Sequence, residues 1–191
     1  MTLPNEHLPL PCSLREVVDR SFPHAEPGPE VKLLDRERLV AYLREAVGAD
    51  DPPLRVIRRR AGDDGGAQLA PADAATVEWV TLAFDHWNRD FPVETPLRDA
   101  LHRLLPLAIA VALKEQSFFT PGTHPLHTLL DRLQQSAVGW QARLDRAGQM
   151  LEQRVQRAVQ RALRWFEDPA TDFAAVTDEL EAAARRDQER A

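Results

Sequence analysis

The chain has 191 residues, of which 43% are hydrophobic and 28% are charged, a composition typical of a soluble globular domain with one core. Its net charge of −6 argues against wholesale binding of nucleic acid but leaves room for a local basic patch. The only cysteine, Cys12, excludes an internal disulfide and favours a reducing compartment.

Nothing in the sequence indicates export or membrane insertion. The N-terminus lacks the basic and apolar regions of a signal peptide. The most apolar stretch lies between Arg103 and Lys114 and is too short to span a bilayer. We therefore expect a cytoplasmic protein.

The predicted elements begin after a proline-rich arm, residues 1–30, which we expect to be partly flexible. Asp35 should cap a helix that runs to Val47 and ends at Gly48. Residues 49–72 are rich in Asp, Gly and Pro and are predicted to be a mobile linker, although they include four arginines, Arg55, Arg58, Arg59 and Arg60.

Two helices should follow the linker. The first begins at about Asp73 and ends near Trp87, with its apolar residues at helical spacing. The second runs from Thr95 to about Glu115 and should be kinked at Pro106. Because the residues on both sides of Pro106 are apolar, this helix is predicted to be the most buried.

The stretch from Ser117 to Trp140 joins this buried helix to the C-terminal helices. A Pro-Gly turn precedes His124-Pro125, which should open a short helix, with Thr123 or His124 as its cap. This helix buries four leucines and should end at Gly139, where Trp140 packs back against the joint.

Two more helices complete the prediction. One runs from about Gln141 to Phe166, and Thr171 caps the last one. A polar tail, residues 186–191, is expected to fray. The whole is an all-α bundle of about six helices with a Pro-rich N-terminal arm and one long loop, forming a single domain over residues 31–185.

The central stretch resembles a motif of domain of unknown function sixteen-thirty-one, a family of uncharacterised helical bacterial proteins. The matching residues, for which we expect a structural role, are Phe118, Phe119, His124, Pro125, Leu129, Leu130, Asp131, Gly139 and Trp140. The resemblance extends over most of the chain after Asp35, which would be a short form of the family.

This resemblance carries expectations about function. Longer relatives sometimes carry a PilZ-type domain, which implies a context of cyclic-di-GMP signalling. Relatives are often labelled thymidine phosphorylase, but the acidic Gly62–Gly66 segment is unsuited to cradle phosphate. The resemblance therefore implies a non-catalytic regulatory or protein-interaction module with an unidentified protein partner.

The sharpest candidate site is a row of arginines on the long helix after Trp140. At about 100° per residue they fall in a stripe roughly 80° wide: Arg143, Arg146, Arg154, Arg157, Arg161 and Arg164. The sequence slightly favours pairing with acids of the last helix, namely Asp178, Glu179 and Glu181. The alternative is a surface for a phosphate-bearing or acidic ligand, since guanidinium groups suit such anions.

Other functions stay open as alternatives. The Arg row, together with Arg58–Arg60, could bind nucleic acid. The four tryptophans, Trp79, Trp87, Trp140 and Trp165, could stack on bases, but their helical spacing beside Leu and Val favours core and corner positions. An enzyme would need His124, His127 and Asp131 to converge on a pocket with another polar group. These three residues could also ligate a metal, but the sequence favours capping and packing roles. We expect no catalytic residue, metal or cofactor, and the sequence leaves the oligomeric state open.

Overall fold

The computed structural model describes residues 32–89, 93–120, 122–137 and 146–189. It confirms the all-α class, and within these ranges the one β-contact is an isolated bridge between Leu33 and Gln68. The α-helices are α2 (Arg36–Glu45), α3 (Pro53–Asp63), α4 (Pro71–Arg89), α5 (Thr95–His102), α6 (Leu105–Lys114), α7 (Pro125–Ala137), α8 (Arg146–Leu163) and α9 (Phe173–Gln188). Two 3₁₀ turns, η1 (Gln116–Phe119) and η2 (Arg164–Phe166), follow α6 and α8.

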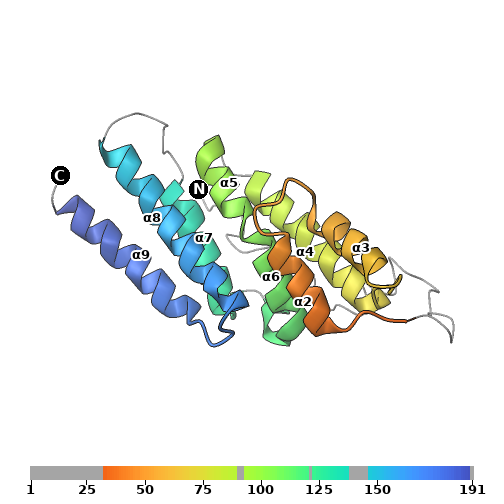
Figure 1. The fold of residues 1–191 in the computed structure, drawn as a ribbon. Helices are drawn as coiled ribbons and strands as arrows, with labels where there is room; N and C mark the ends of the chain where they lie inside the picture. The colour runs from red at the N-terminus through yellow and green to blue at the C-terminus, as the bar shows by residue number, and fades with distance from the viewer. Residues whose placement is uncertain (1–31, 90–92, 121, 138–145, 190–191) are drawn as a thin grey trace.

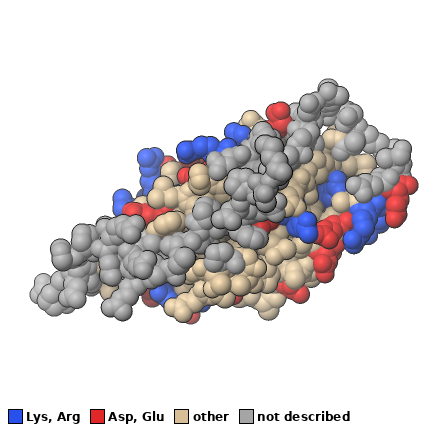
Figure 2. All heavy atoms as spheres, turned by 180° about the vertical axis from the view of Figure 1, so that it is seen from behind, with Lys and Arg blue, Asp and Glu red and all other residues tan. Residues whose placement is uncertain are grey.

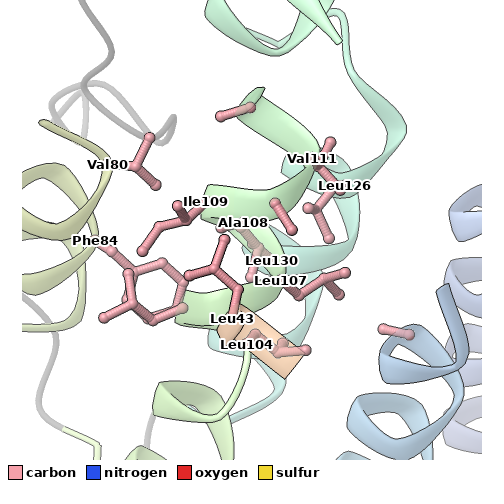
Figure 3. Close-up of a cluster of buried hydrophobic side chains, with 14 of the residues drawn as sticks. Leu43, Val80, Phe84, Leu104, Leu107, Ala108, Ile109, Val111, Leu126 and Leu130 are labelled. Atoms are coloured by element: carbon pink, nitrogen blue, oxygen red, sulfur yellow. The ribbon is translucent and has the colours of Figure 1, made fainter. Parts of the chain in front are cut away.

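Helix α6 lies at the centre of the molecule. Every residue from Leu105 to Leu113 is buried, as predicted for the most apolar stretch. Val80 and Phe84 of α4 pack on one side of α6, and Leu126 and Leu130 of α7 pack on the other (Figure 3). A helix that is apolar all round is stable in water only when neighbours cover every face.

The remaining helices form two groups around α6 (Figure 1). Helices α2, α3 and α4 lie on one side, where α2 and α4 contact α6. Helices α7, α8 and α9 run side by side on the other side, and α5 contacts both α7 and α8. The long α8 and α9 therefore lie at the outer edge of the bundle.

Helix α3 corrects the prediction of a linker over residues 49–72. Pro53 occupies the first helical turn, where a missing N–H costs nothing. Val56, Ile57 and Ala61 are buried along one face of the helix, while Arg58 is exposed. The segment is thus an amphipathic helix between two turns, and its arginines mark the solvated face.

Several ion pairs neutralise this outer face of α3. Asp51 accepts hydrogen bonds from Arg55 and Arg59 at 3.1 and 3.3 Å. Arg60 pairs with Glu45 of α2. Three of the four arginines of α3 thus have acidic partners, which weakens the expectation that they bind nucleic acid.

The phenol of Tyr42 ties α2 to the end of α3. Its hydroxyl donates a hydrogen bond to Asp64, the residue that follows α3. The pKa of Tyr42 is raised, first because of this hydrogen bond and then because of burial and the nearby carboxylate charge. Any stability that this contact contributes is present below pH 10 and is lost as the pH rises through the raised pKa.

The helix predicted over residues 95–115 is divided in two. Helix α5 ends at His102 and α6 begins at Leu105, with Pro106 in its first turn. The prediction of one helix kinked at Pro106 was therefore wrong, since the segment forms two helices. Proline is tolerated in a first turn, so the chain starts a new helix rather than bending one.

The start of α7 confirms the expected role of His124. Its Nδ1 accepts a hydrogen bond from the backbone N–H of Leu126 at 3.1 Å, and its Nε2 lies 3.0 Å from Glu115 Oε2. Because Nδ1 accepts, the proton must sit on Nε2 and be donated to Glu115. Gly122, at φ 70°, supplies the left-handed residue of the predicted turn.

The two C-terminal helices differ from prediction at their ends. Asp172, not Thr171, caps α9, because its Oδ1 accepts from the backbone N–H groups of Ala174 and Ala175. Helix α9 continues to Gln188 and so includes part of the tail that we expected to fray. The N-terminal arm and the Gly139-Trp140 corner lie outside the described residues.

Charges of both signs are distributed over the surface. Figure 2 shows basic and acidic side chains next to each other at the borders of a broad area of other residues. Among the described helices, none is both long enough and apolar enough to cross a membrane.

Candidate anion-binding groove between α8 and α9

Helix α8 presents one apolar face and one basic face. Val155, Ala158, Val159 and Ala162 are buried against the bundle. The arginines alternate with them at spacings of three and four residues, which keeps them together at the edge of the apolar face. The predicted row therefore exists as a continuous feature from Arg154 to Arg164.

This row forms one wall of a groove that we call the α8–α9 groove. Its volume is about 710 Å³. The lining residues come from both helices: Met150, Gln153, Arg154, Arg157, Ala158, Gln160, Arg161 and Arg164 of α8 and η2, and Val176, Glu179, Leu180, Ala183 and Arg186 of α9. The described lining residues thus include five arginines and one glutamate over an apolar floor.

The two walls run in opposite directions, since a short connection joins α8 to α9 (Figure 1). Arg161 pairs with Glu179 across the groove, which shows the register of the two helices. Arg154 lies seven residues before Arg161 on α8, and Arg186 lies seven residues after Glu179 on α9. In this antiparallel register Arg154 and Arg186 therefore lie opposite each other. The end of the groove farthest from η2 is therefore basic on both walls.

The acids of α9 pair with the Arg row only in part. Of the three that we expected to neutralise it, Glu179 does so through Arg161. Glu181 instead binds Arg132 of α7, with 2.9 Å between Oε1 and Nε. Arg157 donates a hydrogen bond to Gln153 of its own helix at 3.4 Å, so its charge is not neutralised by that contact.

Four of the six predicted members of the row are among the described residues that line the groove: Arg154, Arg157, Arg161 and Arg164. Arg143 lies outside the described residues, and Arg146 is the first residue of α8. Conversely, the sequence interpretation missed Arg186, which sits in the tail expected to fray. The antiparallel register of the last two predicted helices was the signal that could have identified it.

The family-motif residues form a packed joint, not a pocket. His124 and His127 are both buried, with ring centroids 5.8 Å apart, and the ring of Phe118 lies 4.7 Å from that of His127. Leu129 and Leu130 belong to the core, and Phe119 packs against it. Pro125 begins α7, the helix that also carries Asp131.

This joint offers little for chemistry. Within the described ranges, no three His, Cys, Asp or Glu side chains gather as a metal site. His124 is already engaged at both ring nitrogens, as a helix cap and as a donor to Glu115. A general acid or base needs a ring nitrogen that reaches a substrate, and both ring nitrogens of His124 are used in these structural contacts.

The tryptophans that the structure describes are also structural. Trp87 and Trp165 are buried, and Trp79 is partly buried against the core. Lys114 lies over the ring of Trp165, with 5.4 Å between Nζ and the centroid. Trp140 lies outside the described residues.

Comparison with known proteins supplies a family but no activity. No curated protein and no solved structure matches the chain significantly. The family described as "Protein of unknown function (DUF1631) 2nd domain" matches residues 35–169, which is more than half of the chain. The match includes α2 through α8 and thus both the motif joint and the basic wall of the groove. The chain therefore belongs to the DUF1631 family.

Proposed function

We propose that this protein is a non-catalytic interaction module that binds an acidic, amphipathic helix of a partner protein in the α8–α9 groove. One observation carries the proposal: in the part of the groove that the structure describes, five arginines and one glutamate surround a floor that includes Val176 and Leu180. A helix with an apolar stripe and an acidic flank would match both the floor and the wall. We propose a regulatory role in the cytoplasm for this interaction.

The composition of the groove favours a protein ligand over nucleic acid. Proteins that bind single strands offer aromatic side chains on which bases stack, and none of the described residues that line this groove is aromatic. The floor is formed by aliphatic side chains, which contribute through burial of apolar surface. A nucleic-acid backbone has no comparable apolar surface to bury there.

A phosphate-bearing small molecule is the second candidate. Arg157 and Arg161 of α8 and Arg164 at the start of η2 are spaced four and three residues apart, and guanidinium forks suit phosphate oxygens. The resemblance to relatives with PilZ-type domains makes cyclic-di-GMP the phosphate compound to test. The aliphatic floor gives this ligand less to contact than an amphipathic helix would have.

The proposal is tested by fluorescence anisotropy with a designed probe. The probe is a labelled amphipathic peptide as long as α8, 18 residues, with leucines on one face and glutamates beside them. We expect the double substitution Arg157→Glu and Arg164→Glu to weaken binding by about tenfold or more, because two attractive contacts become repulsive.

A matched control separates the groove from the overall charge. Arg58 of α3 and Arg185 of α9 are exposed and do not line the groove. Reversing both to Glu changes the net charge by the same amount and should leave binding within about twofold. Equal losses in the two double variants would show that the groove is not the site.

The same assay includes the rival ligands. Labelled single-stranded RNA and cyclic-di-GMP replace the peptide in parallel titrations with the same variants. Groove-dependent binding of RNA, with a steep loss as salt rises, would overturn the proposal in favour of a nucleic-acid module. Groove-dependent binding of cyclic-di-GMP without peptide binding would replace the protein ligand by the nucleotide.

A further inference from the structure

Among the described residues that line the α8–α9 groove, Glu179 is the one acidic side chain. It projects from α9 and pairs with Arg161, near the middle of the basic wall. Its carboxylate thus occupies the place at which an acidic group of a bound helix would meet the same guanidinium. The carboxylate of Glu179 is thus the same chemical group that the groove would recognise in an acidic ligand.

Another carboxylate can replace Glu179 at Arg161, because both side chains of this ion pair are open to water. Arg161 is 47% exposed and Glu179 is 52% exposed. An ion pair this exposed contributes little to stability, since water and salt screen it and both side chains lose rotamer freedom in making it. Breaking it therefore costs the fold little, and an incoming carboxylate can replace Glu179 at Arg161.

The neighbouring acid of α9 behaves differently. Glu181 projects towards α7 and binds Arg132 there, so it connects two helices of the bundle. The two glutamates sit two residues apart on one helix and carry the same charge. Glu181 links α9 to α7, whereas Glu179 lies in the groove.

We infer that Glu179 is an internal competitor that lowers the affinity of the groove for acidic ligands by occupying Arg161. This inference rests on the proposed function of the groove. It sets the ligand class more narrowly: a segment whose acid reaches Arg161 must displace Glu179.

The experiment compares Glu179→Gln with Glu181→Gln, using the acidic 18-residue peptide as the probe. Both variants remove one negative charge from α9, so long-range attraction changes equally. Glu179→Gln should bind the peptide about two- to fivefold more tightly, which is the range that an exposed pair provides. Glu181→Gln should bind it as the wild type does.

A double-mutant cycle shows whether the effect passes through Arg161. In an Arg161→Gln background the peptide should bind more weakly, and the further change Glu179→Gln should no longer tighten binding. Circular dichroism spectra and melting curves of each variant show that the fold is intact. A Glu179→Gln effect of the same size in both backgrounds would contradict competition for Arg161.

The outcomes separate the inference from the proposed function. If Glu179→Gln leaves the affinity unchanged while the Arg157/Arg164 double reversal abolishes binding, the inference is overturned and the groove function stands. If neither set of changes affects binding, the groove function itself is overturned. Equal tightening in Glu179→Gln and Glu181→Gln would also overturn the inference, since net charge alone would explain it.

Discussion

Phe118 and Phe119 are neighbours in the motif joint but differ in burial. Phe118 is fully buried and its ring contacts Phe119, His124 and His127 edge to face. Phe119 is only partly buried against the core. Replacing Phe118 by Ala should lower the free energy of unfolding by about 3–5 kcal/mol, because it leaves a cavity among well-packed neighbours.

The adjacent residue is the control for this prediction. Phe119→Ala should cost clearly less, since part of its ring already faces water and no closed cavity forms. Urea denaturation of both variants, followed by tryptophan fluorescence, gives the two free energies. Equal costs would contradict the assignment of Phe118 as the core residue of the pair.

Single residues were predictable where local chemistry decides their role. His124 was a cap candidate because it precedes a proline at a helix start, and its Nδ1 does accept from Leu126. The contact of its other ring nitrogen with Glu115 was not predictable. It depends on how η1 folds back toward the start of α7, which no local pattern encodes.

At the scale of elements, α3 has the clearest test. Ile57 is fully buried in the core cluster although it lies in a segment that reads as a linker. Ile57→Ala should therefore cost about 2–5 kcal/mol of unfolding free energy, as for other large-to-small changes in a core. A mobile linker would tolerate the change.

The next residue along α3 serves as its comparison. Arg58 is exposed, so Arg58→Ala should change the unfolding free energy by no more than about 0.5 kcal/mol. Thermal melting of the two variants under one buffer condition is sufficient. A small effect of Ile57→Ala would return the segment to the linker interpretation.

The reasons for missing α3 and the break in residues 95–115 are physical. Turn-forming residues lie on both sides of α3 and dominate the composition of residues 49–72. Only four of the eleven residues of α3 itself are buried. Periodicity is a weak signal in so short a helix. At Pro106 the sequence allowed either a kink or a new start, and the packing of α5 against α7 and α8 selects the new start.

At the scale of the whole molecule, the position of α6 predicts a pattern of hydrogen exchange. Its amides lie under helices on both sides (Figure 3), so they should exchange only through global unfolding. The last turn of α9 has helix neighbours on fewer sides and should exchange orders of magnitude faster. Exchange followed by NMR or mass spectrometry at several temperatures would measure both.

The candidate groove shows how far sequence reasoning reaches at this scale. The basic wall was visible from spacing along one helix. The opposite wall was visible only in part: Glu179 was among the acids expected to pair with the row, whereas Arg186 acquires its place only through the register between α8 and α9. Likewise, Glu181 was expected to pair with the Arg row but pairs with Arg132 of α7 instead. Its choice of partner depends on how α7, α8 and α9 pack together.

The complete burial of α6 also has a consequence for the unfolded chain. Nine consecutive residues, Leu105–Leu113, carry no charge, and such a stretch associates with copies of itself when it is exposed. Arg103 and Lys114 stand at its two ends, where charges act as gatekeepers against aggregation. Escape from aggregation during synthesis therefore depends on how soon α4 and α7 cover this helix, and one of these partners, α7, is made only after α6 itself.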